Sequence, residues 1–564
     1  MNPTARPGPQ APAPIQNYAL LGDGRSAALV SRDGSIDWLC WPRFDSPACF
    51  AALLGTPEHG RWWIGPDAAA RVSRRYRPDT LVLETTFETD TGRIVLTDFM
   101  AVHAPALIRI VECQSGTVAI RTDFAPRRDY GATADPHGFA LHGPTTPDFT
   151  VRAGQRVCFA MTDAASPAPD PERALTETEA FWRAWSGRCT YHGRHRDIVL
   201  RSLLTLKALC HTGTGGIVAA PTTSLPEQIG GERNWDYRFC WPRDSSLTVR
   251  ALRRGGYREE AKSWFAWLDR ATGSAADRMR PLYGLDGDAA TSERILPWLP
   301  GYRASAPVRV GNAAAGQLQL DVYGELLEAL STDGDNWPLQ TDMIARLEDI
   351  WRQPDEGIWE TRGGRRHFTF SKVMAWVAVD RALRCAAAFS LPAPTEQWRA
   401  LRDTIHAEVC RHGFNAERNS FTQIYGGKAL DASLLLLPAV GFLPASDPRI
   451  AGTIAAIEQD LIVDGFVLRY RNDDGLPPGE GAFLACSFWY ADALILQGRH
   501  DEAEAVFSRL TGLANDVGLL SEEYAPIARR MLGNFPQGFS HLALIDTALN
   551  LDQDHYSAGT AISA

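Results

Sequence analysis

The sequence lacks a long hydrophobic run and an excess of basic residues. No stretch reaches about 18 consecutive apolar residues, the length that a membrane-spanning helix needs, so we expect no membrane partner. The formal net charge is −10, and nucleic acids bind basic surfaces, so we expect no nucleic-acid partner either. Both absences favour a neutral small molecule as the ligand.

The ten cysteines lack close pairing, because no two of them form a CxxC motif. Without such pairs a zinc site is not expected, and most of the thiols lie in apolar surroundings. We therefore expect reduced, buried thiols in a cytoplasmic protein that binds no metal. The cysteines are Cys40, Cys49, Cys113, Cys158, Cys189, Cys210, Cys240, Cys385, Cys410 and Cys486.

The first 16 residues lack the apolar core of a signal peptide and are rich in proline and alanine. We predict a disordered tail over residues 1–16. The whole chain has 564 residues, which exceeds the size at which a single hydrophobic core stops growing, so we expect more than one domain.

Residues 17–168 have the pattern of antiparallel strands. Short apolar runs alternate with turn dipeptides, and Asp33-Gly34 within SAALVSRDGSIDWLC is typical of a hairpin turn. We predict a β-sandwich domain for this part of the chain. Residues 169–194 change to helical character and are predicted to form a helical linker.

Residues 195–564 contain two kinds of helix in alternation. One kind is amphipathic, and the other is apolar or small on nearly all sides. Six helical hairpins, with one helix of each in an outer ring and the other in an inner ring, account for this alternation, so we predict an (α/α)6 barrel. The alternative is a generic helical array. The lack of a repeated sequence signature argues against a solenoid. The twelve predicted helices, outer and inner in turn, span residues 196–211, 244–255, 258–272, 312–331, 337–352, 368–390, 395–411, 428–438, 447–462, 482–498, 500–513 and 537–551.

Polar and aromatic loops come directly before the inner helices of this predicted barrel. The loop WDYRFCWPRDSS precedes the helix at 244–255, and GIWETRGGRRHFTF precedes the helix at 368–390. Inner helices of such a barrel run in the same direction, so we expect these loops to open at one end and to line a crater with Trp, Arg, Asp and Glu side chains.

Glu360 is the candidate general acid. It follows Trp359 and precedes Gly363-Gly364, in a loop that leads into a long apolar segment. An aromatic neighbour lowers the local polarity and raises the pKa of a carboxyl group, which keeps a proton available near neutral pH. The alternative is an ordinary solvated turn residue.

Residues near the start of the helix at 244–255 suit the binding of a sugar. Asp244 can accept hydrogen bonds from two vicinal hydroxyl groups while Arg243 donates to a third. Trp241 and Trp359 offer flat rings to the faces of a sugar. The alternatives are a helix cap for Asp244 and ordinary core positions for the two tryptophans.

Three further carboxylates precede the last two inner helices. Glu480, in GEGAF, is a candidate substrate-binding residue, and the alternative is a first-turn helix residue favoured by the helix dipole. Glu522 and Glu523, in SEEY, are a solvated loop pair or a functional pair. In the functional interpretation one of the two is the general base, and Glu523 is also a candidate substrate-binding residue. Inverting hydrolysis needs a base about 6.5 to 9.5 Å from the acid, across the reacting carbon.

Several long stretches carry a family resemblance. They are YALLGDGRSAALVSRDGSIDWLCWPRFDSPACFAALLG, RNWDYRFCWPRDSS, GIWETRGG with FTFSKVMAW, GEGAFLACSFWYADAL, and SEEY with LGNFPQGFSHLALI. In this order they resemble glycoside hydrolase family 15, the glucoamylase and trehalase family, and the first of them resembles the opening of its bacterial trehalase-like members. The resemblance covers nearly the whole chain after the tail.

This resemblance implies a β-sandwich followed by an (α/α)6 barrel. It also implies an inverting, exo-acting hydrolase that releases β-glucose from the non-reducing end of α-glucosides without a metal or organic cofactor. By the family pattern the general acid is Glu360 and the general base is Glu522. Trp241, Arg243 and Asp244 match the residues that hold the terminal glucose.

Two positions depart from the family pattern. Thr361 stands where fungal glucoamylases have a second acidic residue, so the contacts to the leaving sugar should differ. Pro242 stands beside Trp241 where Leu or Thr is expected, which affects the placement of the tryptophan ring.

The sequence leaves three matters open. The substrate is trehalose, an isomaltose-type sugar or a malto-oligosaccharide, and the amino-terminal stretch favours trehalose or another small α-glucoside. A disaccharide phosphorylase on the same barrel is an alternative that the SEEY segment disfavours, and a catalytically silent carbohydrate-binding protein is one that the two carboxylates disfavour. The oligomeric state also stays open.

Overall fold

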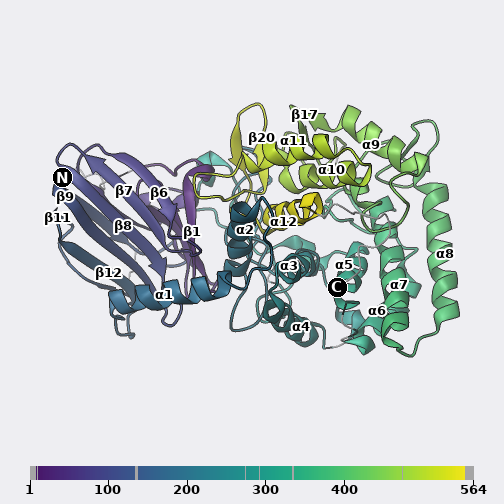
Figure 1. Cartoon of the computed structure of the whole chain (residues 1–564), viewed down its shortest axis with the longest axis horizontal. Helices are drawn as coiled ribbons and strands as arrows, with labels where there is room; N and C mark the ends of the chain where they lie inside the picture. The colour runs from purple at the N-terminus through teal and green to yellow at the C-terminus, as the bar shows by residue number, and fades with distance from the viewer. Residues whose placement is uncertain are drawn as a thin grey trace.

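The protein consists of a β-domain followed by a larger helical domain (Figure 1). The computed structural model describes residue 8 and residues 10–133, 138–273, 275–290, 292–332, 334, 336–472 and 474–552.

The β-domain is built from antiparallel strands that form two layers sharing one long strand, β9. Residues 106–112 of β9 pair with β12, while residues 120–125 pair with β5. This confirms the predicted β-sandwich. The strands are β1 (Tyr18–Gly22), β2 (Ala27–Ser31), β3 (Ser35–Cys40), β4 (Ala48–Phe50), β5 (Arg61–Pro66), β6 (Arg71–Tyr76), β7 (Leu83–Thr89), β8 (Gly92–Met100), β9 (Ala106–Ala125), β10 (Phe139–His142), β11 (Asp148–Arg152) and β12 (Arg156–Asp163).

The predicted hairpin turn at Asp33-Gly34 joins β2 to β3. Gly34 has a φ of +85°, and a Cβ atom there would lie 2.3 Å from the carbonyl oxygen of Ile64. Only glycine fits, because other residues rarely adopt this conformation and none tolerates that contact.

Arg109, on β9, ties the two layers of the β-domain together from inside. Its guanidinium group donates to both carboxylate oxygens of Asp98, at 2.8 and 3.1 Å, and to the carbonyl oxygens of Trp62 and Gly34, at 2.6 and 2.8 Å. The side chains of Arg109 and Asp98 are both 0% exposed. The ion pair is therefore fully buried, and each charge depends on its partner.

The helical domain follows α1 (Pro171–Ser186), the linker helix that lies along β12 (Figure 1). Its described residues form eleven α-helices, and one of its 3-10 helices, η7, takes the position of the predicted eighth helix. They are α2 (Arg196–Ala208), α3 (Pro242–Arg254), α4 (Arg258–Thr272), α5 (Asp321–Leu330), α6 (Trp337–Ile350), α7 (Thr369–Phe389), α8 (Thr395–His412), η7 (Ala432–Leu436), α9 (Pro448–Asp460), α10 (Leu484–Leu496), α11 (His500–Thr511) and α12 (Gly538–Asp552).

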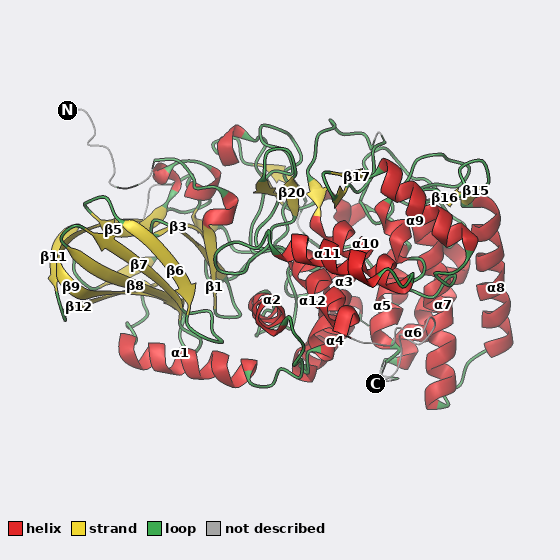
Figure 2. Cartoon of the chain, turned by 45° about the horizontal axis from the view of Figure 1, so that its top comes forward, coloured by secondary structure: helices red, strands yellow, loops and turns green. Residues whose placement is uncertain are grey.

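Six of these elements form a closed inner ring. Each packs on the next in the order α3, α5, α7, η7, α10 and α12, and α12 returns to α3. The outer helices cover this ring, as α8 covers α7 and α11 covers α10 and α12 (Figure 2). The inner helix α7 is almost entirely buried, whereas α8 buries only one stripe, at Trp398, Leu401, Ile405 and Val409. The (α/α)6 prediction is confirmed.

Three predicted helices differ in the structure. The segment at 428–438 forms only η7, because Asp431 caps a short turn and Pro438 follows within a few residues. The helix predicted from residue 312 begins at Asp321, after a separate 3-10 turn at Ala313–Gly316. Helix α2, predicted to be among the wetter outer helices, is mostly buried because it lies between β1 and the inner helix α12 (Figure 2).

The predicted tail is only partly tested, because residues 1–7 and 9 lie outside the described residues. For residues 13–16 the prediction of disorder is wrong. Ile15 begins a short 3-10 helix and is 1% exposed, and the Tyr302 hydroxyl donates to the carbonyl oxygen of Ala13 at 2.9 Å.

The β-domain braces the loop that leads into α3. The Trp38 indole N–H donates to the carbonyl oxygen of Pro221 at 2.8 Å. Arg238, which pairs with Asp236, donates to the carbonyl oxygen of Ser46 at 3.2 Å. Through both contacts the β-domain supports the position of this loop.

No helix in the described part of the chain combines the length and the hydropathy needed to cross a bilayer. All ten cysteines are free thiols, as predicted; Cys158 and Cys410 are partly exposed and the other eight are buried.

Replacement of Arg109 by Met should destabilise the protein by about 3–5 kcal/mol, because Asp98 would be left as a buried charge without a partner. The matched control is Arg71→Met, which breaks the pair with Glu88 at 3.6 Å between side chains that are 87% and 42% exposed. That control should lower the free energy of unfolding by about 1 kcal/mol or less. Urea-induced unfolding of both variants measures the difference, and equal losses would contradict this account.

Candidate active site

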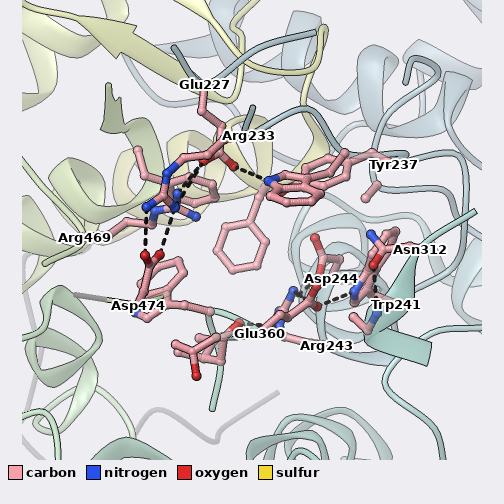
Figure 3. Close-up of a pocket in the computed structure, with 18 of the residues that line it drawn as sticks. Glu227, Arg233, Tyr237, Trp241, Arg243, Asp244, Asn312, Glu360, Arg469 and Asp474 are labelled. Atoms are coloured by element: carbon pink, nitrogen blue, oxygen red, sulfur yellow. Dashed lines mark hydrogen bonds and ion pairs between the residues drawn. The ribbon is translucent and has the colours of Figure 1, made fainter. Parts of the chain in front are cut away.

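A pocket with about 840 Å³ of empty space, including space open to solvent, lies where the loops before the inner helices meet (Figure 3). Its lining includes residues from the loops before α3, α5, α7, α10 and α12, which is the arrangement that the loop positions predicted. Five of the predicted site residues line it, namely Trp241, Arg243, Asp244, Trp359 and Glu360.

Glu360 lies in the wall of the pocket in a strained backbone conformation, with a φ of +57°. Residues other than glycine rarely adopt this conformation, and it is enriched at functional sites. Its Oε1 atom accepts a hydrogen bond from the Trp241 indole N–H at 2.6 Å and lies 3.6 Å from Nη2 of Arg243. Burial raises the pKa of Glu360, and Arg243 and Trp241 partly offset this rise. The direction agrees with a carboxyl group that keeps its proton.

Arg243 and Asp244 lie in the first turn of α3, beside Glu360 (Figure 3). Arg243 donates from Nη1 to the carbonyl oxygen of Ile358 at 2.8 Å and from Nε to the Asp244 carboxylate at 3.1 Å. Asp244 therefore pairs with its neighbour, and no side-chain hydrogen bond caps the helix. The arginine links the start of α3 to the Glu360 loop.

Trp359 lines the pocket, and its N–H group is bound by Asp431. The indole N–H donates to both carboxylate oxygens of Asp431, at 2.9 and 3.0 Å. The ring packs against Phe483 and Trp489, with centroids 5.5 and 5.9 Å apart. This packing gives the Glu360 loop an apolar support on one side.

Glu522 is fully buried behind Tyr237, which lines the pocket. Its Oε1 atom accepts from the Tyr237 hydroxyl at 2.6 Å, and its Oε2 atom accepts from the backbone N–H of Asn534 at 2.9 Å. A Cβ atom at Gly533 would lie 2.4 Å from Oε2, so this carboxylate position requires glycine there. Burial and the nearby Glu227 raise the pKa of Glu522 to about 8.

Two adjacent rings connect the predicted acid with the predicted base. The rings of Tyr237 and Trp241 make an edge contact with centroids 5.5 Å apart. One ring donates to Glu522 and the other to Glu360. The fold therefore brings together, around one pair of rings, two carboxylates that lie far apart in the sequence.

The opposite wall of the pocket is formed by Glu227, Arg233, Arg469 and Asp474 (Figure 3). Arg233 makes a two-pronged ion pair with Asp474, at 2.8 and 2.9 Å. Burial alone would lower the pKa of both arginines, and the surrounding carboxylates raise it above its ordinary value.

The predicted substrate-binding residues Glu480 and Glu523 lie behind this wall, outside the lining of the pocket. Glu480 pairs with Nη2 of Arg469 at 2.6 Å and with Arg233 at 3.2 Å. Glu523 is 0% exposed and accepts a hydrogen bond from the backbone N–H of Gly481 at 2.8 Å. Both carboxylates hold the arginine wall in place.

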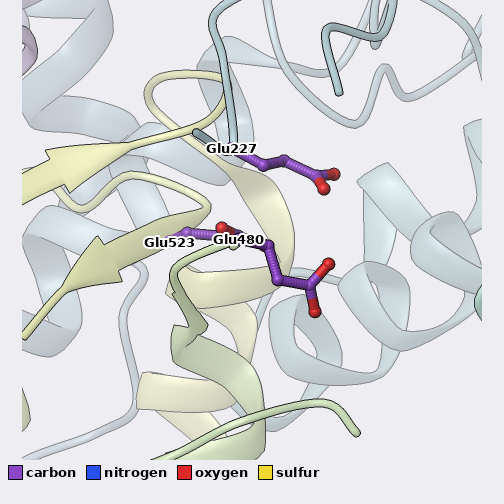
Figure 4. Close-up of side chains that lie close together, drawn as sticks. All are labelled: Glu227, Glu480 and Glu523. Atoms are coloured by element: carbon purple, nitrogen blue, oxygen red, sulfur yellow. The ribbon is translucent and has the colours of Figure 1, made fainter. Parts of the chain in front are cut away.

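Glu227, Glu480 and Glu523 have the spacing of a metal site, since one oxygen of each lies within 4.8 Å of the others (Figure 4). The centre of this group is filled by a single nitrogen, Nη2 of Arg469. It lies 2.8, 2.6 and 3.4 Å from Glu227, Glu480 and Glu523, respectively. The guanidinium group supplies the positive charge that these carboxylates need, so we assign no metal to them.

Several residues that line the pocket were not predicted from the sequence. Tyr237 lies inside the stretch WDYRFCWPRDSS, and Glu227 and Arg233 lie in the same loop before α3. Arg469 and Asp474 lie in the loop before α10. Their place just before an inner helix was the available signal, but loop residues carry no periodicity that shows which side chains face inward.

Replacement of Arg469 by Met should destabilise the protein by about 3–5 kcal/mol at pH 7.5, because Glu227, Glu480 and Glu523 would be buried without their cation. Burial already raises the pKa values of Glu227 and Glu523, and loss of the arginine that lowers them raises them further, so protonation relieves the loss and the deficit should shrink as the pH falls towards 5. Free energies of unfolding in urea at both pH values measure this.

The control for Arg469→Met is Arg365→Met, whose pair with Glu356 at 3.0 Å involves an arginine side chain that is 45% exposed. This control should lower the free energy of unfolding only slightly, and by the same amount at both pH values. A deficit in Arg469→Met that stays constant between the two pH values would contradict the assigned role of the arginine.

Two family models match this chain. The model described as "Glycosyl hydrolases family 15" matches residues 193–549, and the model described as "Trehalase-like, N-terminal" matches residues 7–150. The chain is similar to a bacterial glucoamylase solved in complex with acarbose, with a TM-score of 0.72, 14% identity, and coverage of 97% of this chain and 96% of that chain. At this identity the likeness shows the fold.

The chain is also similar to curated relatives. It is 38% identical to the trehalase of Thermoplasma volcanium, over 96% of this chain and 94% of the relative. It is 37% identical to the trehalase of Mycobacterium tuberculosis, over 95% of this chain and 89% of the relative. The match to the family model over the helical domain, together with these relatives, shows that the chain belongs to glycosyl hydrolase family 15 and is a glycoside hydrolase.

Proposed function

We propose that this glycoside hydrolase cleaves α-glucosides by a single displacement with inversion, with Glu360 as general acid and Glu522 as general base. The observation that carries the proposal is the pair of carboxylates held by Trp241 and Tyr237, which share a ring contact in the wall of one pocket. Each carboxyl group accepts a hydrogen bond from its own ring donor, so the two groups have different surroundings.

In the proposed reaction Glu360 gives its proton to the glycosidic oxygen as the bond from that oxygen to the anomeric carbon breaks. A water molecule attacks the anomeric carbon from the opposite face and gives a proton to Glu522. The products are β-glucose and the leaving sugar. Glu360 ends ionised and Glu522 ends protonated, so one proton passes back to Glu360 through solvent before the next turnover.

Arg243 and Asp244 are proposed to bind the hydroxyl groups of the terminal glucose. Both line the pocket next to Glu360, and their mutual hydrogen bond of 3.1 Å fixes a donor beside an acceptor. Such a pair matches vicinal hydroxyl groups, which donate and accept at once. Trp241 and Trp359 supply the aromatic surface next to them.

We propose trehalose as the substrate. Support comes from relatives named trehalase, which are 37–38% identical over nearly the full length of both chains, and from the match of residues 7–150 to a trehalase-like amino-terminal domain. The pocket is also walled on two sides by charged residues, which can form hydrogen bonds with the hydroxyl groups of a sugar. We further propose that the protein acts in the cytoplasm, where its ten free thiols would stay reduced.

Replacement of Glu360 by Gln should lower turnover of trehalose by about 10²–10⁴-fold, because the leaving oxygen then lacks its proton donor. The same variant should retain turnover of α-glucosyl fluoride, since fluoride leaves without protonation. Glu522→Gln should lose turnover of both substrates, because each needs an activated water.

The control for these two variants is Glu232→Gln, an exposed glutamate on the loop before α3, which should keep most of the activity on both substrates. Steady-state rates on the two substrates provide the test. Near-normal turnover of trehalose by Glu522→Gln would reject the assignment of the base.

Hydrolysis of trehalose should be faster than hydrolysis of isomaltose or maltose, and the first glucose released should be the β-anomer. Rates on the three disaccharides, with the anomer followed by proton NMR, measure both points. Activity must not depend on added phosphate. Release of the α-anomer would overturn inversion, and a requirement for phosphate with release of glucose 1-phosphate would favour a phosphorylase.

A further inference from the structure

Glu227 is a carboxylate of the pocket wall that contacts Trp235 and Arg469. It is 1% exposed, and burial raises the pKa of its carboxyl group, a rise that Arg469 and Arg233 partly offset. Its Oε1 atom accepts from the Trp235 indole N–H at 3.1 Å, and its Oε2 atom accepts from Nη2 of Arg469 at 2.8 Å. A negative charge is therefore held at a defined place in the wall.

The backbone next to Glu227 is joined to the segment that holds Glu522. The backbone N–H of Gly533 donates to the carbonyl oxygen of Pro226 at 2.8 Å. The next residue, Asn534, donates its backbone N–H to the Glu522 carboxylate at 2.9 Å. The two glutamates are thus positioned by directly connected pieces of backbone.

The negative charge of Glu227 raises the pKa of the nearby Glu522 carboxyl group. Burial makes the largest contribution to the raised pKa of Glu522, and Glu227 makes the next largest. The Tyr237 hydroxyl, the Asn534 N–H and the Arg469 guanidinium act in the opposite direction. The titratable and charged groups that face Glu522 are Tyr237, Glu227, Arg469 and the adjacent Glu523.

We propose that Glu227 is a positioning residue for hydrolysis, whose ionised carboxylate holds Arg469 in the pocket wall and sets the pH above which Glu522 accepts a proton from water. The inference rests on the proposed function, in which Glu522 is the base. Glu227 itself takes no proton from the attacking water in this scheme.

The test is the pH dependence of kcat/KM for trehalose in Glu227→Gln. Removal of the negative charge lowers the pKa of Glu522, so the base stays ionised at lower pH. The low-pH limb of the profile should therefore move to lower pH by about one unit. Glu227→Ser removes the same charge in a smaller side chain and should give the same shift, so the result does not depend on one variant folding.

Two matched variants control for this effect. Glu227→Asp keeps the charge and should leave the limb close to its wild-type position, even if the shorter side chain lowers kcat. Asp474→Asn removes one negative charge from the same wall, where Asp474 pairs with Arg233, and should also leave the limb in place. A shift that follows Glu227 alone shows a local effect on the base.

Three outcomes would overturn the proposal. They are an unmoved limb in both charge-removing variants at Glu227, a shift to higher pH, or an equal shift in Asp474→Asn. Failure of the proposed function has a different signature, since Glu522→Gln would then keep its turnover. An inactive Glu522→Gln together with an unmoved limb in Glu227→Gln rejects the role of Glu227 and leaves the base assignment standing.

Discussion

Buried carboxylates are stable only beside donors and cations, and this requirement organises the whole pocket. Arg243 and Arg469 each hold one wall, the first between Asp244 and Glu360 and the second among Glu227, Glu480 and Glu523. Neither guanidinium group can be removed without leaving charge in a medium that solvates it poorly. The arginines therefore hold the carboxyl groups in fixed positions, which a site for acid and base chemistry needs.

The closed ring of inner helices makes this arrangement possible. Because α3, α5, α7, η7, α10 and α12 close on themselves, the loops before them converge at one end, and residues hundreds of positions apart come into contact. The β-domain adds a second support from outside. Trp38 and Ser46 hold the loop before α3 from behind, at Pro221 and at Arg238. This loop carries both Tyr237 and Trp241, so the β-domain supports the two rings that hold the proposed acid and the proposed base.

The framework of the fold could be predicted from the sequence, whereas most of the second wall of the pocket could not. The alternation of helix types yielded the barrel, and the position of Glu360 beside Trp359 matched a buried carboxyl group. Glu480 and Glu523 are near the site but support an arginine and do not line the pocket. Glu227, Tyr237 and Arg469 were not singled out, because their surroundings in the sequence resemble those of ordinary loops. The helix expected at 428–438 shortened to η7, since capping by Asp431 outweighed the apolar run.

By itself the sequence determined the fold class, the order of the two domains, the loops that bear the chemistry and the family, because hydrophobic periodicity and long motifs are properties of neighbouring residues. Only the tertiary structure decided which carboxylates share a cation, which face the pocket and which lie behind it. The clearest example is the single Nη2 nitrogen of Arg469, which lies among the carboxylates of three glutamates from different loops. Partners in a buried ion network come from separate loops, and their distances arise only when the ring of helices has closed.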